Sequence, residues 1–226
     1  MRSAFSLRRK HRGSVNHPDN LGWTMPPACP LLAAYPMSLL FFKRVLANPV
    51  QVGYIVPSSG FLTRKTAKFI DYSRARTVVE LGPGEGCHSR RIVRKLRKDA
   101  KLILVELDDH FARHLTEQFA DDPRVVVVNA NALDLPETLE KLGTPQPDYI
   151  VSGIPFTIME KDLRELLLGA IARSMGPDTR FITYQASLRI SSHEHFDLVR
   201  REHCLFNVPP LHVMELQRSA PAAVPA

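Results

Sequence analysis

Cysteines are few in this sequence of 226 residues, and their pattern excludes two kinds of stabilisation. The three cysteines, Cys29, Cys87 and Cys204, are odd in number, scattered, and include no CxxC pair. This spacing argues against a disulfide framework and against a zinc site, and it favours a reducing cytoplasm. The nine histidines show no metal-ligand spacing either. We therefore predict no bound metal.

Long apolar runs are also missing. None reaches the roughly 18 residues that a membrane-spanning helix needs. The nearest candidate, "PLLAAYPMSLLFF", contains Pro36 and continues into Lys43 and Arg44. The basic residues near the start lack a convincing cleavage site after them, so we expect no secretory signal. No internal repeat is present, and the length suits one α/β domain with a modest extension.

Positive charge exceeds negative charge along the chain. There are 30 Lys and Arg against 23 Asp and Glu, which gives a net charge of +7 and a pI near 9.5. The hydrophobic content of 44% is that of a soluble globular protein. The excess favours contact with a polyanion, but it does not choose between nucleic acid and an anionic membrane.

The chain divides into four predicted parts. Residues 1–36 are basic and then rich in proline, which is typical of a loosely ordered N-terminus. Residues 37–70 hold an amphipathic segment and a second helix. Residues 71–217 alternate between strand and helix patterns and form the main domain. Residues 218–226 are of low complexity and are expected to be disordered.

Seven segments of the main domain are predicted as strands. A helix is clearest in "KDLRELLLGAIARSM", where apolar residues recur at helical spacing. Strands alternating with helices imply a mostly parallel sheet covered on both faces, and "LFNVPPLHVMEL" leaves room only for a hairpin, so the last strand should be antiparallel. The predicted strands are "TVVEL" (77–81), "KLILVEL" (101–107), "RVVVVNA" (124–130), "DYIVSG" (148–153), "RFITYQA" (180–186), a stretch near "CLFNV" (204–208) and "LHVMEL" (211–216).

A glycine loop follows the first of these strands, in "VVELGPGEGCHSRR". Gly82, Gly84 and Gly86 stand at alternate positions, where glycine allows the backbone to approach a ligand closely. Glu106 ends the next strand and is placed to accept hydrogen bonds from the two hydroxyls of a ribose. A dinucleotide fingerprint would need glycine at Cys87. The pattern therefore predicts a nucleoside site of another kind.

The segment "ELGPGEG" resembles the S-adenosylmethionine loop of class I methyltransferases, which have a Rossmann-like fold. The resemblance implies S-adenosyl-L-methionine as cofactor and S-adenosyl-L-homocysteine as product. It places Asn131 beside the adenine, where this class usually has an acid, although Asn129 to Asn131 fit an ordinary polar strand exit equally well. The residues assigned to the cofactor are Ser58 and Ser59, which are also candidate helix N-caps, with Glu80, Gly82, Gly84, Gly86, Glu106, Leu107, Asn131, Ala132, Ser152 and Gly153.

Across residues 47–216 the order of features is similar to that of bacterial phospholipid N-methyltransferases. The matching pieces are "NPVQVGYIVPSS", "VVELGPGEG", "LVELDDHF", "VSGIPF" and "FNVPPLHV". The resemblance implies N-methylation of phosphatidylethanolamine and its monomethyl and dimethyl forms towards phosphatidylcholine. The same architecture also resembles the ribosomal RNA adenine dimethyltransferases.

Two features of the sequence distinguish between these two families. Amino-directed nucleic-acid methyltransferases carry Asn or Asp, an apolar residue, Pro and an aromatic residue, and the polar side chain holds the base amine. Here Gly153 precedes Ile154, Pro155 and Phe156, and Ser152 should face the other side of the strand. The RNA enzymes also carry a helical domain after the core, where this sequence has a short tail. We therefore expect a phospholipid substrate and disfavour nucleic acid.

Aromatic and basic residues are candidates for the acceptor site. Phe156, Tyr184 and Tyr54 are proposed as a wall for the methylated ammonium, because aromatic faces attract such cations. Arg189 is proposed to contact the lipid phosphate. The alternatives are core packing for the aromatic residues and a solvated surface position for the arginine.

The segment "MSLLFFKRVL" suits a helix in the plane of a membrane surface. We expect a monomer at the cytoplasmic face of the inner membrane, although packing of this segment on the domain is an alternative. The basic helix at 90–98 fits a solvated face or an anionic partner. RNA, a small molecule and ornithine lipid remain alternative methyl acceptors. A catalytically silent protein that binds lipid or RNA is a further alternative. The expected membrane contacts are Leu39, Phe41, Phe42, Lys43 and Arg44.

Overall fold

A seven-stranded sheet forms the centre of the protein in the computed structural model, which describes residues 59–207 and 210–220. The strand order is β3-β2-β1-β4-β5-β7-β6, and β7 is antiparallel to both of its neighbours while the other pairs are parallel. This confirms the predicted mostly parallel sheet with an antiparallel last strand. The strands are β1 (Thr77–Leu81), β2 (Lys101–Glu106), β3 (Val125–Asn129), β4 (Tyr149–Ser152), β5 (Arg180–Gln185), β6 (Phe196–Cys204) and β7 (Leu211–Arg218).

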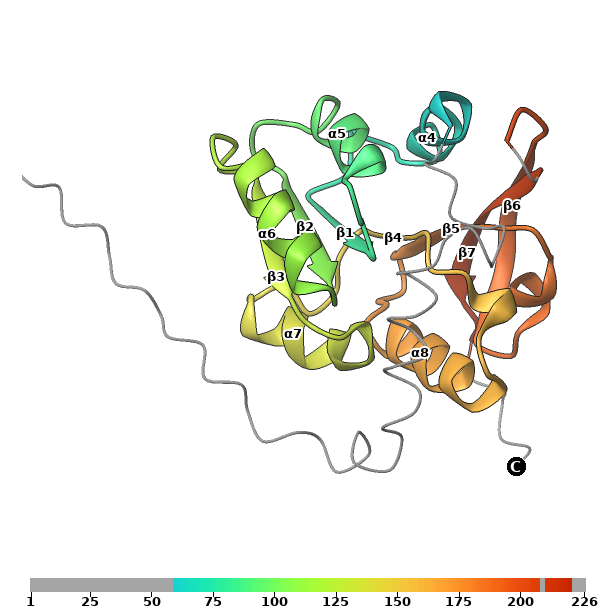
Figure 1. Cartoon of the computed structure of the whole chain (residues 1–226). Coiled ribbons are helices and arrows are strands. Elements are labelled where there is room, and N and C mark those ends of the chain that lie inside the picture. Colours follow the sequence, from blue (N-terminus) through green and yellow to red (C-terminus); the bar gives the residue numbers. More distant parts are fainter. Residues whose placement is uncertain (1–58, 208–209, 221–226) are drawn as a thin grey trace, which may run out of the picture. The chain divides into compact units, whose positions relative to one another are not determined.

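Helices cover both faces of this sheet, with α4, α5 and α6 on one side and α7 and α8 on the other (Figure 1). Val79 and Leu81 of β1 pack with the α7 and α8 side, whereas Val78 packs with the α4 and α5 side. Strands buried on both faces read as continuous apolar runs, which explains why their positions were readable in the sequence. The helices are α4 (Gly60–Ala67), α5 (Cys87–Val93), α6 (Asp109–Gln118), α7 (Leu135–Lys141) and α8 (Lys161–Arg173), with 3-10 turns η1 (Ala132–Asp134), η2 (Phe156–Ile158) and η3 (Arg189–Ser192).

Side-chain caps define where two of these helices begin. The Ser59 hydroxyl accepts a hydrogen bond of 3.1 Å from the Leu62 backbone N–H, so Ser59 is the N-cap of α4. The Asp108 carboxylate does the same for the first turn of α6. Within the part of the chain that the structure describes, no helix is long and apolar enough to cross a membrane.

The prediction of a strand near 204–208 was wrong. The sixth strand is Phe196–Cys204, and Leu205 and Phe206 lie beyond it in the turn towards β7. This strand forms the edge of the sheet, and only its two end residues are buried. Its sequence is therefore mostly polar, whereas the apolar pair that suggested a strand is exposed.

Candidate active site

The glycine loop connects β1 to α5 with an unusual backbone. Gly82, Gly84 and Gly86 all have positive φ, at 65°, 54° and 73°, a region that side chains other than glycine rarely adopt. A Cβ at Gly86 would lie 2.9 Å from Leu115 Cδ2, so the loop also packs closely on α6. A Cβ at Gly84 would meet nothing within 4 Å, which leaves space for a ligand at the middle of the loop.

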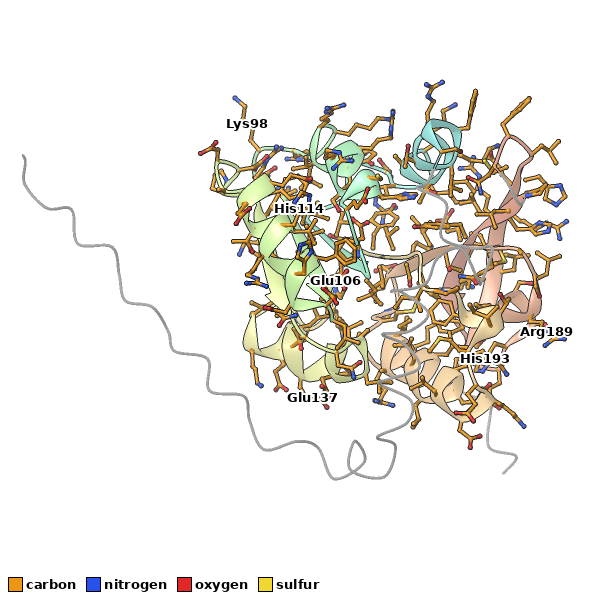
Figure 2. All side chains as sticks on the ribbon, in the orientation of Figure 1. Lys98, Glu106, His114, Glu137, Arg189 and His193 are labelled. Atoms are coloured by element: carbon orange, nitrogen blue, oxygen red, sulfur yellow. The ribbon has the colours of Figure 1, made fainter. Side chains whose placement is uncertain are left out.

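Glu106 lies at the carboxyl end of β2 and faces the loop (Figure 2). Its side chain is held from two sides, since Oε2 accepts from the Gly84 backbone N–H at 3.0 Å and Oε1 accepts from that of Asp108 at 2.9 Å. Burial raises the pKa of Glu106 above its ordinary value, and these N–H donors oppose that rise. A carboxylate has about four acceptor positions, so two remain for hydroxyl groups of a bound ribose.

Glu80 is buried one strand away, beneath the start of α5. The Ser89 hydroxyl donates to its Oε2 at 2.7 Å, and burial raises the pKa of Glu80 to about 7. Its carboxylate thus contacts α5, and its assignment to the cofactor stays a prediction.

The third strand end supplies amide groups. The Asn129 amide donates to the Glu106 and Leu107 carbonyls, which ties the ends of β2 and β3 together. The Asn131 side chain accepts from Leu133 N–H and so caps η1, the turn that begins with Ala132. The proposed contact between Asn131 and adenine must therefore share its amide oxygen with this cap.

The end of β4 meets Tyr184 of β5. A Cβ at Gly153 would lie 2.1 Å from the Tyr184 hydroxyl oxygen and 2.7 Å from its Cζ, so the phenol rests directly on the Gly153 backbone. Ser152 is fully buried and its hydroxyl accepts from Ile154 N–H, which is a structural contact. The space that a larger residue at 153 would need is filled by a tyrosine.

His88 supports that tyrosine and was missed in the sequence. Its ring stacks on the Tyr184 ring, with centroids 4.7 Å apart and planes within 10°. The residue is 4% exposed, its Nε2 is buried without a hydrogen-bond partner, and burial lowers the pKa of His88 to about 3. The imidazole is therefore neutral near pH 7. Only its place directly after the glycine loop hinted at a role.

Phe156 and Arg189 border a small pocket on the α8 side of the sheet. Phe156 is fully buried edge-to-face against Phe181, which matches the core-packing alternative for this residue. The pocket has a volume of about 70 Å³. Figure 2 shows Arg189 and His193 near each other, away from Glu106. The lining residues are Phe156, Thr157, Arg164, Glu165, Leu168, Arg189, Ile190 and His193.

Charges in this pocket are partly paired. Glu165 accepts from His193 Nε2 and from Arg164 at 3.3 Å. Thr157 Oγ1 is buried without a hydrogen-bond partner. Two arginines against one carboxylate leave the pocket positive, which favours an anion.

Several predicted residues lie outside the described part of the chain. These are Ser58, Tyr54, Leu39, Phe41, Phe42, Lys43 and Arg44. Within residues 59–207 and 210–220, no group of three or more His, Cys, Asp and Glu side chains is placed to hold a metal ion.

The sheet order, the open glycine loop and the acid one strand later fit an adenosyl cofactor and define a class I S-adenosylmethionine-dependent methyltransferase. Crystal structures of this class share the fold. N-methyltransferase NodS from Bradyrhizobium japonicum WM9, solved with S-adenosyl-L-homocysteine, matches with a TM-score of 0.59 and 11% identity, over 81% of this chain and 99% of that one.

Sequence comparison narrows the class. The family model of ribosomal RNA adenine dimethylase matches residues 60–168. An ornithine lipid N-methyltransferase from Singulisphaera acidiphila is 33% identical over 142 residues, covering 63% of this chain and 74% of that enzyme. Ribosomal RNA small subunit methyltransferase A from Geobacter sulfurreducens is 30% identical over 105 residues, but this match spans only 37% of its length. The chain belongs to the same family as the Singulisphaera enzyme and is an S-adenosylmethionine-dependent N-methyltransferase.

Proposed function

We propose that the protein methylates the head-group amine of a membrane aminolipid. Phosphatidylethanolamine and ornithine lipid are the candidate acceptors, since both carry a primary amine a few bonds from an anionic group. The observation that carries the proposal is at Gly153, which has no side chain where the nucleic-acid enzymes carry Asn or Asp, and the Tyr184 phenol fills the space that such a side chain would need. The likeness to an ornithine lipid N-methyltransferase supports it.

Methyl transfer requires the protein mainly to position the acceptor amine. When bound, S-adenosylmethionine supplies an activated methyl group. The acceptor ammonium must lose a proton, which water can take, before its nitrogen lone pair attacks. The protein then has to orient the amine and exclude bulk water. The Tyr184 hydroxyl at Gly153 is a group to which an amine N–H can donate, and neutral His88 behind it adds no charge that would repel a cation.

The arginine pocket is proposed to receive the anionic part of the head group. Its volume of about 70 Å³ has room for a few water molecules, at roughly 10–15 Å³ each on this measure, so it suits a phosphate or a carboxylate rather than a whole lipid. Arg164 and Arg189 supply the positive charge, and the Thr157 hydroxyl is a further donor. Phe156, which borders the pocket, lies three residues after Gly153, at most about 11 Å along the chain, and the proposal requires one head group to span both places.

Ribosomal RNA adenine is the second candidate acceptor. It is favoured by the family model over residues 60–168 and by the similarity to ribosomal RNA methyltransferases. Against it stands the glycine at 153.

Other parts of the prediction also stay proposals. Tyr54 as a cation contact and the segment at 39–44 as a membrane anchor rest on the sequence alone. The same holds for a monomer bound peripherally at the cytoplasmic face of the inner membrane.

A direct acceptor comparison tests the proposal. The purified chain is incubated with labelled S-adenosylmethionine and vesicles of phosphatidylethanolamine, vesicles of ornithine lipid, or undermethylated small-subunit RNA. Phosphatidylcholine vesicles, which offer no free amine, are the matched control. We expect label in at least one aminolipid and none in the control. Label in RNA alone would overturn the lipid assignment.

A further inference from the structure

Three exposed apolar residues meet at one end of the described domain. Phe61, Leu205 and Phe206 are 55%, 69% and 76% exposed. Phe61 lies in the first turn of α4 and Phe206 follows β6, yet their rings lie 5.2 Å apart. Figure 1 shows α4 and the hairpin of β6 and β7 at the same side of the sheet. We call these three residues the aromatic tip.

The aromatic tip lies at the active-site edge of the sheet. Gln185, the last residue of β5, pairs with His212 near the start of β7, and Cys204 pairs with Leu211. The turn after Cys204 therefore extends beyond the carboxyl end of β5. Parallel strands share this edge, so it is the same edge that carries the glycine loop, Glu106 and Gly153.

One cation contacts the aromatic tip, and two others lie on the same two elements, α4 and β6. The Arg64 guanidinium lies 5.9 Å from the centre of the Phe61 ring. Lys65 and Arg200 both pair with Glu202, so one carboxylate is shared by two cations. These four charged groups sum to +2, in a chain whose net charge is +7. Exposed rings beside cations are typical of protein surfaces that bind anionic lipid.

We propose that the aromatic tip inserts into the interfacial layer of an anionic bilayer, with the flanking cations on lipid phosphates. This rests on the proposed function in one respect, namely that the methyl acceptor is a bilayer lipid. Inserted this way, the carboxyl edge of the sheet faces the membrane, and a head-group amine approaches Gly153 from the bilayer. The methyl groups of Leu205 offer nothing to a base or a phosphate. The two rings already contact each other at 35°, which leaves no parallel slot for a base.

Vesicle binding by the full chain tests this proposal. Co-sedimentation is measured with phosphatidylcholine vesicles alone and with added phosphatidylglycerol, neither of which is a substrate. We expect the double variant Phe61→Ser and Phe206→Ser to lose affinity for the anionic vesicles by on the order of tenfold or more. Arg64→Ser should weaken binding only to anionic vesicles. The matched control, Leu198→Ser with Val199→Ser, removes apolar residues that are 42% and 47% exposed elsewhere on β6 and should leave affinity unchanged.

Two further readouts keep this result separate from the proposed function. Thermal unfolding and cofactor binding of the double variant should match wild type, and methyl transfer to a short-chain, monomeric aminolipid should persist. Unchanged vesicle affinity in the double variant, or no vesicle binding by wild type, would overturn the proposed membrane insertion of the aromatic tip, whatever the methyl acceptor proves to be. Loss of RNA binding without loss of vesicle binding would assign the surface to nucleic acid and also overturn it. Failure of methyl transfer with vesicle binding as expected would reject the proposed function alone.

Discussion

Replacing Gly153 with alanine should destabilise the fold through a single contact. Gly153 is not among the glycines with positive φ, so a Cβ there meets no backbone penalty. The added atom would instead lie 2.1 Å from the Tyr184 hydroxyl oxygen, 2.7 Å from Cζ and 3.2 Å from Cε2. These distances are far below van der Waals contact. The nearest atoms belong to the Tyr184 phenol, and the stacked His88 ring restricts its movement.

The size of the effect follows from this packing. Overpacking a well-filled site costs about 1–3 kcal/mol. For a chain of this length, that predicts a fall in melting temperature of roughly 2–12 °C. Tyr184→Phe deletes the atom at 2.1 Å and leaves the ring carbons. Combined with Gly153→Ala, it should therefore recover part of the loss, with a coupling free energy of about 1 kcal/mol.

The assay is a double-mutant cycle by thermal and denaturant unfolding. Gly60→Ala is the matched control, since a Cβ there meets nothing within 4 Å and φ is not positive, so it should not destabilise. If Gly153→Ala unfolds like wild type, or if Tyr184→Phe leaves its effect unchanged, then the close contact is wrong. Tyr184 would then not fill the space of a side chain at 153.

Three other predictions follow from the site. Glu106→Ala should lower cofactor affinity roughly a hundredfold while the fold stays intact, because it removes charged hydrogen bonds to the ribose; unchanged affinity by calorimetry would refute the assignment. Glu80 has a folded pKa of about 7, above its ordinary 4.5, so its contribution to stability is full below pH 4.5 and is lost as pH rises through 7. Glu80→Gln should therefore gain stability relative to wild type by up to roughly 3 kcal/mol between pH 5 and pH 8, and a pH-independent difference in unfolding free energy would count against a buried, protonated carboxyl. Arg164→Ala with Arg189→Ala should raise KM for an anionic aminolipid while cofactor affinity stays constant; an equal rise for an amine acceptor without an anionic group would show that the pocket does not bind the anion.

The sheet was predictable because its central strands are buried on both faces. The run "KLILVEL", for example, is continuously apolar from Leu102 to Val105, and the connecting helices fix the parallel direction of such strands. The edge strand β6 gave no such signal, since its residues between Phe196 and Cys204 are polar or exposed. Leu205 and Phe206 looked like strand residues because they are apolar. In the structure they lie in a turn and are exposed.

The candidate site was readable only where its residues are local. The glycine loop and Glu106 sit at strand ends, and their predicted roles follow from their position in the chain. The contact of Gly153 with Tyr184 joins neighbouring strands, and it becomes visible once Ser152 is known to pair with Thr183. His88 and the pairing of Phe61 with Phe206 depend on tertiary packing between segments without a shared periodicity.

Methylation of a membrane aminolipid is tested most directly by lipid analysis in cells that make phosphatidylethanolamine and ornithine lipid but no methylated form of either. The wild-type chain and the Glu106→Ala variant are expressed in parallel, and extracted lipids are resolved by mass spectrometry. We expect aminolipid species heavier by whole methyl groups with wild type and none with the variant. Unmodified aminolipids in both strains, with the wild-type protein folded and able to bind S-adenosylmethionine, would contradict it.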